Sequence, residues 1–227
     1  MIRVPRTVPA PRRPSRIIRA APVRIARVLG IDASLSSTGL AYREHGNLIA
    51  YNIDPKRRRG PERLSYILSH IEAATAQIDP TLVVLEDYAK GIGGGKGGSG
   101  RTFDIGELGG VIKTYFWNRG IDVMLVSPTT LKMAITGRGN ADAGKKINGK
   151  KVKDKTKPEM RAALRESFGL DVSQGDAADA CGLMLIGEMR LGSTTVARAK
   201  QAQLRLHSLS DCVIIQSSQR NLKLIAD

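Results

Sequence analysis

The sequence has little cysteine and histidine, and neither occurs in a pattern typical of a metal site or a nucleophilic active site. The 227 residues include two Cys and three His. Cys181 and Cys212 stand alone, without a CxxC pair, which predicts small buried side chains in a reducing compartment. His45, His70 and His207 show no ligand spacing. The pattern favours neither a zinc centre nor a Ser-His-Asp or Cys-His arrangement.

The chain also lacks a long hydrophobic run, an internal repeat and a phosphate-binding loop. No apolar run approaches the roughly 20 residues that a membrane-spanning helix needs, and no secretory signal is visible. The glycine-rich segment 90–101 contains Lys96, but Gly97 follows it where a P-loop has Ser or Thr. We interpret 90–101 as a loop that covers a neighbouring site; a simple linker is the alternative.

Acidic residues are absent from the first 27 positions, which hold eight Arg and five Pro. This composition predicts an arm that is disordered in isolation and contacts DNA or solvent. With only one Ser, the arm fits a transit peptide poorly. We expect a cytoplasmic protein, and a mitochondrial one if residues 1–26 are a transit peptide.

The net charge of +15 suits a polyanionic partner, and nucleic acid is the first candidate. Without the eight Arg of the arm, +7 remains, so the body of the protein is basic as well. The length predicts one α/β domain with extensions. We expect an arm at 1–26, a folded domain at 27–192 and a C-terminal extension of unknown role at 193–227.

Hydrophobic patterning predicts a mixed five-stranded sheet flanked by helices. Two short apolar runs, within RVLGIDAS and TLVVLEDY, are typical of buried strands, and a helix between them favours parallel pairing. The segments GLAYRE and NLIAYNI form a hairpin around HGN, and IDVMLV is the fifth strand. Helices are expected at about 64–78 and 104–118, in a short segment that begins with TTLKMAI, and at about 157–169 and 174–192. The last two begin at capping boxes, Thr156-x-x-Glu159 and Ser173-x-x-Asp176.

Four carboxylates lie at the ends of these buried elements. Asp32 ends the first strand, Glu86 ends the fourth, and Asp176 and Asp179 share one face of the last helix. Acids placed so close together repel one another unless cations lie between them. An all-oxygen set predicts Mg²⁺, with Mn²⁺ able to substitute. Strand alternation points Asp87 to the opposite face.

Taken singly, these acids have simpler explanations. Asp176 alone fits a helix cap and Asp32 alone fits a turn. The metal-site prediction therefore depends on their convergence. Two such ions about 3.5–4 Å apart can promote in-line cleavage of a phosphodiester bond.

Three motifs together resemble the RuvC-type Holliday junction resolvases of the ribonuclease H-like fold. They are GIDAS-x3-TG, the strand-terminal Glu of VVLED, and DAADA at the start of the last helix. The resemblance spans about residues 27–190. It implies a homodimeric, Mg²⁺-dependent endonuclease that cuts four-way and other branched DNA, with Asp32, Glu86, Asp176 and Asp179 as metal-binding catalytic acids.

The resemblance also implies basic residues near the scissile phosphate, matched here by Lys132 and Lys157. We add Tyr88, Lys96 and Arg101 as candidate DNA contacts, although the family's aromatic position corresponds to Ala89. The extra Gly-rich and basic segments are similar to those of viral, bacteriophage-like members. The helix at 104–118, with its aromatic Tyr115, Phe116 and Trp117, is our candidate contact surface between subunits.

Two alternatives stay open. One is a ribonuclease H-like nuclease acting on RNA–DNA hybrids or flaps. The other is a non-catalytic nucleic-acid-binding protein on the same fold. A nucleotide-binding protein of the actin and sugar-kinase group would need further phosphate loops, which we do not find.

Overall fold

A mixed sheet forms the centre of the computed structural model, which describes residues 26–87, 99–137, 146–147, 150–151, 156–192 and 212–215. The strands lie in the order β3-β2-β1-β4-β5-β8. Their bounds are β1 Val28–Asp32, β2 Thr38–Glu44, β3 Asn47–Ile53, β4 Leu82–Glu86, β5 Asp122–Val126 and β8 Val213–Ile215. β1, β4 and β5 are parallel, and the other pairs are antiparallel.

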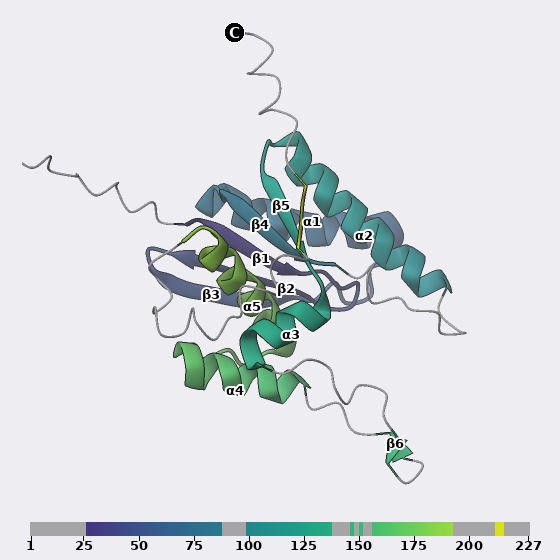
Figure 1. Cartoon of the computed structure of the whole chain (residues 1–227). Helices are drawn as coiled ribbons and strands as arrows, with labels where there is room; N and C mark the ends of the chain where they lie inside the picture. The colour runs from purple at the N-terminus through teal and green to yellow at the C-terminus, as the bar shows by residue number, and fades with distance from the viewer. Residues whose placement is uncertain are drawn as a thin grey trace, which may run out of the picture.

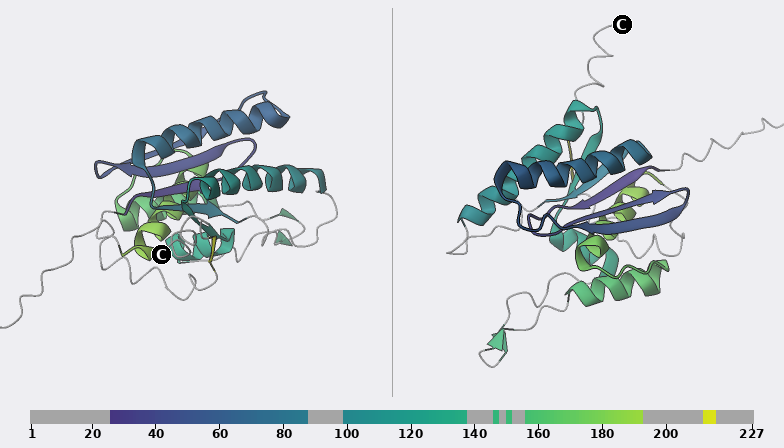
Figure 2. Two further views of the ribbon diagram at one scale, coloured as in Figure 1. Left: turned by 90° about the horizontal axis from the view of Figure 1, so that it is seen from above. Right: turned by 180° about the vertical axis from the view of Figure 1, so that it is seen from behind.

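Helices cover both faces of this sheet (Figure 1). They are α1 Gly60–Ile78, α2 Ser99–Asn118, α3 Pro128–Thr136, α4 Thr156–Phe168 and α5 Gly175–Arg190. Seen from behind in Figure 2, α1 lies across the sheet on the face opposite α5. A two-stranded ribbon, β6 Lys146–Ile147 and β7 Lys150–Lys151, precedes α4.

The α/β class and the parallel pairing of β1 with β4 are confirmed, with two differences from the expected fold. The sheet has a sixth strand, β8, because an apolar segment of the C-terminal extension pairs with the edge of β5. The hydrophobic patterning predicted no strand in the basic stretch 138–157, but the backbones of Lys146–Ile147 and Lys150–Lys151 pair within it. The His45-Gly46 turn of the β2–β3 hairpin is confirmed, with both residues at positive φ.

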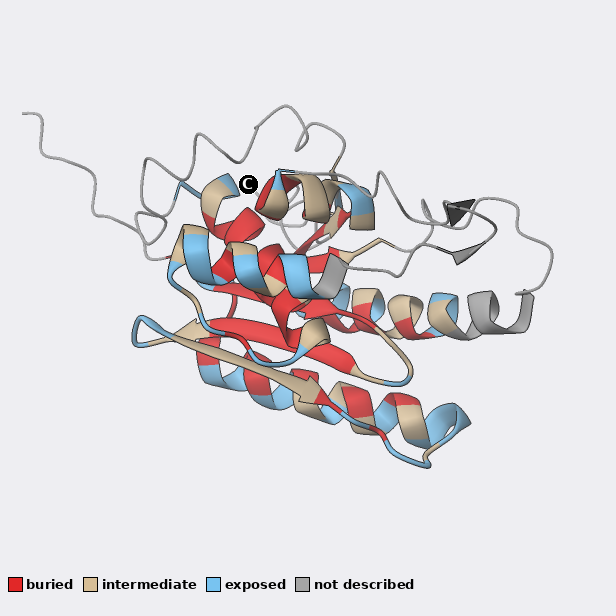
Figure 3. Cartoon of the chain, turned by 90° about the horizontal axis from the view of Figure 1, so that it is seen from below, coloured by how far each residue is buried: buried red, intermediate tan, exposed pale blue. Residues whose placement is uncertain are grey.

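Strand alternation divides the core into two layers. On β1, Leu29 and Ile31 pack with α1 and α2, whereas Val28 packs with α3, α4 and α5. Figure 3 shows the resulting buried band through the sheet and the inner faces of the helices. By the same alternation Asp32 and Glu86, at the ends of β1 and β4, belong to the face that α5 covers.

The prediction that Tyr115 and Phe116 belong to a contact surface between subunits is wrong. Tyr115 and Phe116 are 8% and 0% exposed and pack in the layer beneath α2, because they continue its apolar stripe. Trp117, at 39% exposed, remains on the surface. The aromatic end of α2 is therefore mainly core.

Two glycines bring α5 unusually close to the sheet. A Cβ at Gly30 on β1 would overlap the carbonyl oxygen of Ala180 and come within 2.6 Å of the Met184 amide nitrogen. A Cβ at Gly39 on β2 would overlap the carbonyl group of Asp176. Only a residue without a side chain permits this contact, which brings the first turns of α5 to the ends of β1 and β2.

Replacing Gly30 by Ala is expected to lower the free energy of unfolding by about 3 kcal/mol, because α5 must move away from a packed sheet. Urea denaturation measures the effect. The matched control is Gly110→Ala on α2, where a Cβ meets nothing within 4 Å. The control should gain up to about 1 kcal/mol from helix propensity. Equal effects of the two substitutions would contradict the close-approach explanation.

Candidate metal centre

Three carboxylates from two elements converge at the end of β1 and the start of α5. One oxygen from each of Asp32, Asp176 and Asp179 lies within 4.8 Å of the other two. Asp32 is 4% exposed, and the two acids of α5 are half-buried. Three like charges at this spacing repel one another, and a cation between them removes that cost. The oxygen donors fit a hard divalent ion such as Mg²⁺ or Mn²⁺.

Glu86 lies one strand away from these three acids. The register pairs Ile31 with Leu85, so Asp32 and Glu86 follow as neighbours at the carboxyl ends of parallel strands. Glu86 is half-buried and does not belong to the group that lies within 4.8 Å. Its part as a fourth ligand stays a prediction.

The start of α5 differs from the expected capping box. The N-cap is Gln174, not Ser173, and its side chain makes no capping hydrogen bond. Asp176 is therefore the second residue of the helix, so the expected capping-box bond from Ser173 is wrong. The cap comes instead from β3, where the side-chain oxygen of Asn52 accepts the Ala177 N–H at 2.8 Å. Sequence reasoning missed Asn52, because nothing in NLIAYNI links it to a helix more than 120 residues later.

The candidate DNA-binding residues are placed to different extents. Lys132 lies on α3 and is half-buried. Arg101 lies in α2 and Lys157 lies in α4, and at these two positions the structure describes only the backbone. Tyr88 and Lys96 lie outside the described residues. All five assignments stay predictions.

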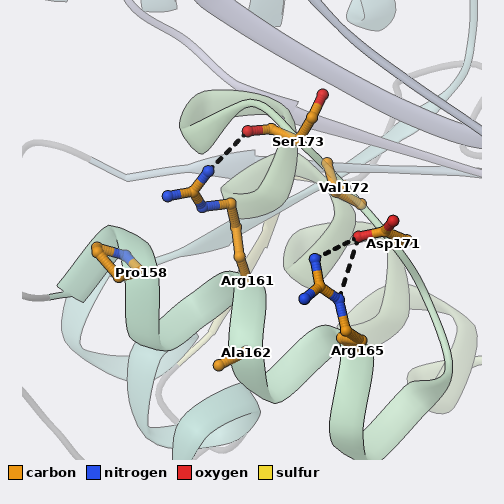
Figure 4. A pocket seen from close by; sticks show the side chains of 7 residues that line it. All are labelled: Pro158, Arg161, Ala162, Arg165, Asp171, Val172 and Ser173. Carbon is orange, nitrogen blue, oxygen red and sulfur yellow. Dashed lines mark hydrogen bonds and ion pairs between the residues drawn. The ribbon is translucent and has the colours of Figure 1, made fainter.

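A separate hollow of about 440 Å³ lies between α4 and the segment that leads into α5 (Figure 4). Arg161 donates a hydrogen bond to the Ser173 carbonyl oxygen at 2.8 Å, and Arg165 pairs with Asp171 at 2.7 Å. The three clustered acids do not line this hollow. The two Arg hold the connection in place ahead of α5.

Comparison with known proteins relates the chain to one group of enzymes. No family model matches. The crossover junction endodeoxyribonuclease RuvC of Mycobacterium tuberculosis is 27% identical over 188 residues, which cover 79% of this chain and 89% of the relative. The RuvC of Mycobacterium bovis matches equally well.

The chain is similar to RuvC in sequence over most of its length and in fold. The solved structure of Thermus thermophilus RuvC superimposes with a TM-score of 0.52 at 20% identity, covering 73% of this chain and 96% of that one. A second structure, Thermus thermophilus RuvC in complex with a Holliday junction substrate, superimposes with a TM-score of 0.53 at 18% identity. The superposition covers 74% of this chain and 97% of that one. These structures confirm the ribonuclease H-like fold.

The relation to RuvC confirms the resemblance drawn from GIDAS-x3-TG, VVLED and DAADA. The viral origin is not tested by these cellular relatives and stays a prediction. Among the described residues, no helix is both long and apolar enough to cross a membrane.

Proposed function

We propose that this RuvC-like protein is a metal-dependent endonuclease that cuts four-way and other branched DNA. The observation that carries the proposal is the convergence of Asp32, Asp176 and Asp179 on a RuvC-like fold. Its relatives bear the name crossover junction endodeoxyribonuclease. The basic body of the chain suits a DNA backbone.

Mg²⁺ is the proposed ion, and Mn²⁺ should substitute. Bound beside a phosphodiester, such an ion neutralises charge on the phosphate and lowers the pKa of a water nucleophile. The chain contributes its ligands from two rigid elements: Asp32 from the sheet, Asp176 and Asp179 from α5. Glu86, on the neighbouring strand, is the proposed fourth acid. The close approach at Gly30 and Gly39 sets the distance between the two groups of ligands.

We infer that the working unit is a homodimer. A two-fold pair of identical sites can cut two strands of like polarity across a four-way junction. Sedimentation should therefore give twice the mass of the chain, and the paired cuts should be symmetric about the junction centre. A strictly monomeric enzyme would contradict this part of the proposal.

The proposed activity is tested on three labelled substrates: a four-way junction, a linear duplex and an RNA–DNA hybrid. With Mg²⁺ or Mn²⁺ the junction should be cut fastest, and EDTA should abolish cutting. Glu86→Gln should cut far more slowly while still binding the junction. Binding without cleavage under both metals would leave a non-catalytic binding protein, whereas preference for the hybrid would favour a ribonuclease H-like activity.

Deleting residues 1–26 is expected to weaken DNA binding at low salt and to flatten its salt dependence. The deletion removes seven Arg but keeps Arg27, whose guanidinium pairs with Asp79 at 3.0 Å. Each lost phosphate contact should reduce the slope of log affinity against log salt by about 0.9. Preference for the junction over duplex should survive.

The matched control for the deletion keeps the arm and replaces those seven Arg by Gln. It should behave like the deletion, because charge and not length sets the slope. Titrations at several salt concentrations measure both variants. An unchanged slope would make the arm a targeting or inert segment.

A further inference from the structure

The first turn of α5 depends on a residue from another part of the chain. The first amide groups of a helix have no partner within it, and a side chain at the N-cap usually accepts one of them. Gln174 makes no such bond. The Oδ1 atom of Asn52 on β3 accepts the Ala177 N–H at 2.8 Å instead. A strand residue therefore supplies the cap of the helix that carries two of the three clustered acids.

This bond fixes which way the Asn52 amide points. A backbone N–H can only donate, so the amide oxygen must face Ala177 and the amide nitrogen must point the other way. That nitrogen, Nδ2, donates to the Ser37 hydroxyl at 2.9 Å and lies 3.4 Å from the Oδ2 atom of Asp176. The same side chain thus contacts both the backbone of α5 and one of its metal-site carboxylates.

The backbone of Asn52 adds a further attachment. Its N–H donates to the Oε1 atom of Gln174 at 3.1 Å, so β3 and the start of α5 are joined on both sides of Asp176. Gly39, the register partner of Asn52, lies against the Asp176 carbonyl group. Small movements of this turn would carry Asp176 and Asp179 away from Asp32.

We propose that Asn52 is a positioning residue of the metal centre. It holds the Asp176 carboxylate and the first turn of α5 in the arrangement that a divalent ion needs, without itself being a ligand. Residues that orient metal ligands typically contribute about 10–100-fold to metal affinity. The inference rests on the proposed metal-dependent function and names a residue that serves the same site.

The first test is a titration with Mn²⁺ in the absence of DNA, in which electron paramagnetic resonance measures the bound and free ion. Asn52→Ala should raise the half-saturating Mn²⁺ concentration by about 10-fold or more. The matched control is Gln174→Ala, which removes a different bond between β3 and the start of α5, the one from the Asn52 N–H to the Gln174 side chain. The control should change the half-saturating Mn²⁺ concentration by about two-fold, well below the change in Asn52→Ala, since the Asn52 side chain still caps α5 and contacts Asp176.

Thermal unfolding of the same proteins shows whether each variant is folded at the temperature of the titration. If Asn52→Ala does not fold, Ser37→Ala provides the second variant, because it removes the other acceptor of the Asn52 amide and leaves the helix cap intact. It should weaken Mn²⁺ binding in the same direction by a smaller factor. Parent-like Mn²⁺ binding by folded Asn52→Ala, or an equal shift in Gln174→Ala, would overturn the proposal.

Junction cleavage, measured separately, distinguishes this inference from the proposed function. A parent that binds Mn²⁺, an Asn52→Ala variant that does not, and no cleavage by either would support the positioning role and reject the nuclease. If the parent cuts junctions and Asn52→Ala binds Mn²⁺ normally, the result would support the nuclease and reject the positioning role of Asn52. A parent without measurable Mn²⁺ binding would reject both.

Discussion

Replacing Asp179 by Asn is expected to slow junction cleavage by about 10³-fold while leaving junction binding intact. The substitution keeps the shape of the side chain and removes one charge from the three acids whose oxygens lie within 4.8 Å. Charge stabilisation by a bound metal contributes several kcal/mol, and about 4 kcal/mol corresponds to that factor in rate. Binding persists because the basic surface is unchanged, and it should tighten at low salt.

The same variant should be more stable than the parent when no divalent ion is present, and it should gain less stability than the parent when Mn²⁺ is added. Without a cation the three acids repel one another, so Asp179→Asn should melt at a higher temperature than the parent in EDTA. With Mn²⁺ at about 100 times its dissociation constant, the parent should gain about 2.7 kcal/mol from binding, and the variant much less. Differential scanning calorimetry with and without Mn²⁺ measures both effects.

Asp87→Asn is the matched control for these measurements. Asp87 follows Glu86 directly but lies outside the cluster of three acids, and its backbone N–H bonds to the Val126 carbonyl oxygen at 2.8 Å. Its cleavage rate and its response to Mn²⁺ should stay close to those of the parent. If Asp87→Asn proved as inactive as Asp179→Asn, the set of metal ligands would need to be redrawn.

Replacing Arg43 by Met is expected to lower the free energy of unfolding by about 3–5 kcal/mol. Arg43 on β2 donates from Nε to the Oε1 atom of Glu188 on α5 at 2.8 Å, and the Glu188 side chain is 1% exposed. Removing the cation leaves that buried carboxylate without the Arg43 guanidinium that offsets its charge. The surroundings disfavour charge: burial raises the pKa of the adjacent Cys181 thiol to about 12, an effect that Arg43 opposes and Glu188 reinforces.

Two further variants separate burial from ion pairing as such. The double variant Arg43→Met with Glu188→Met should recover most of the lost stability, because a buried ion pair can often be replaced by apolar side chains of similar size. Arg165→Met breaks the exposed pair with Asp171, whose side chains are 68% and 77% exposed, and should cost at most about 1 kcal/mol. Urea denaturation measures the free energy of unfolding of each variant. If Arg43→Met were as stable as Arg165→Met or more stable, the assigned role of the buried pair would be contradicted.

Local patterns predicted much of the fold correctly. The apolar positions of α1, including Leu64, Ile67 and Ile71, are buried as the helical spacing requires. VLGID and LVVLE are the adjacent parallel strands β1 and β4. Such elements are readable because burial imposes a period of 3.6 or 2 on the residues themselves. The same rule places Tyr115 and Phe116 on the apolar stripe of α2, and both are buried. The error was the separate choice of these aromatic side chains as part of a contact surface between subunits.

The candidate site was readable in part for a similar reason. Asp32 and the DAADA segment stand out because acids rarely end buried elements without a partner. The Ser173 capping box was misleading, because the local pattern cannot show that a distant side chain occupies the capping position. Strand β8 was equally hidden, since a three-residue pairing depends on which edge the returning chain meets.

The sequence by itself determined the kinds of element, the acids available and a basic charge suited to DNA. Those properties follow from residue periodicity and composition, which need no knowledge of distant contacts. The tertiary structure alone decided which acids meet, because that depends on α5 lying against Gly30 and Gly39. It also decided that Asn52 reaches across to α5, and that Arg43 and Glu188 pair. These contacts join residues more than 100 positions apart, and only packing in three dimensions specifies them.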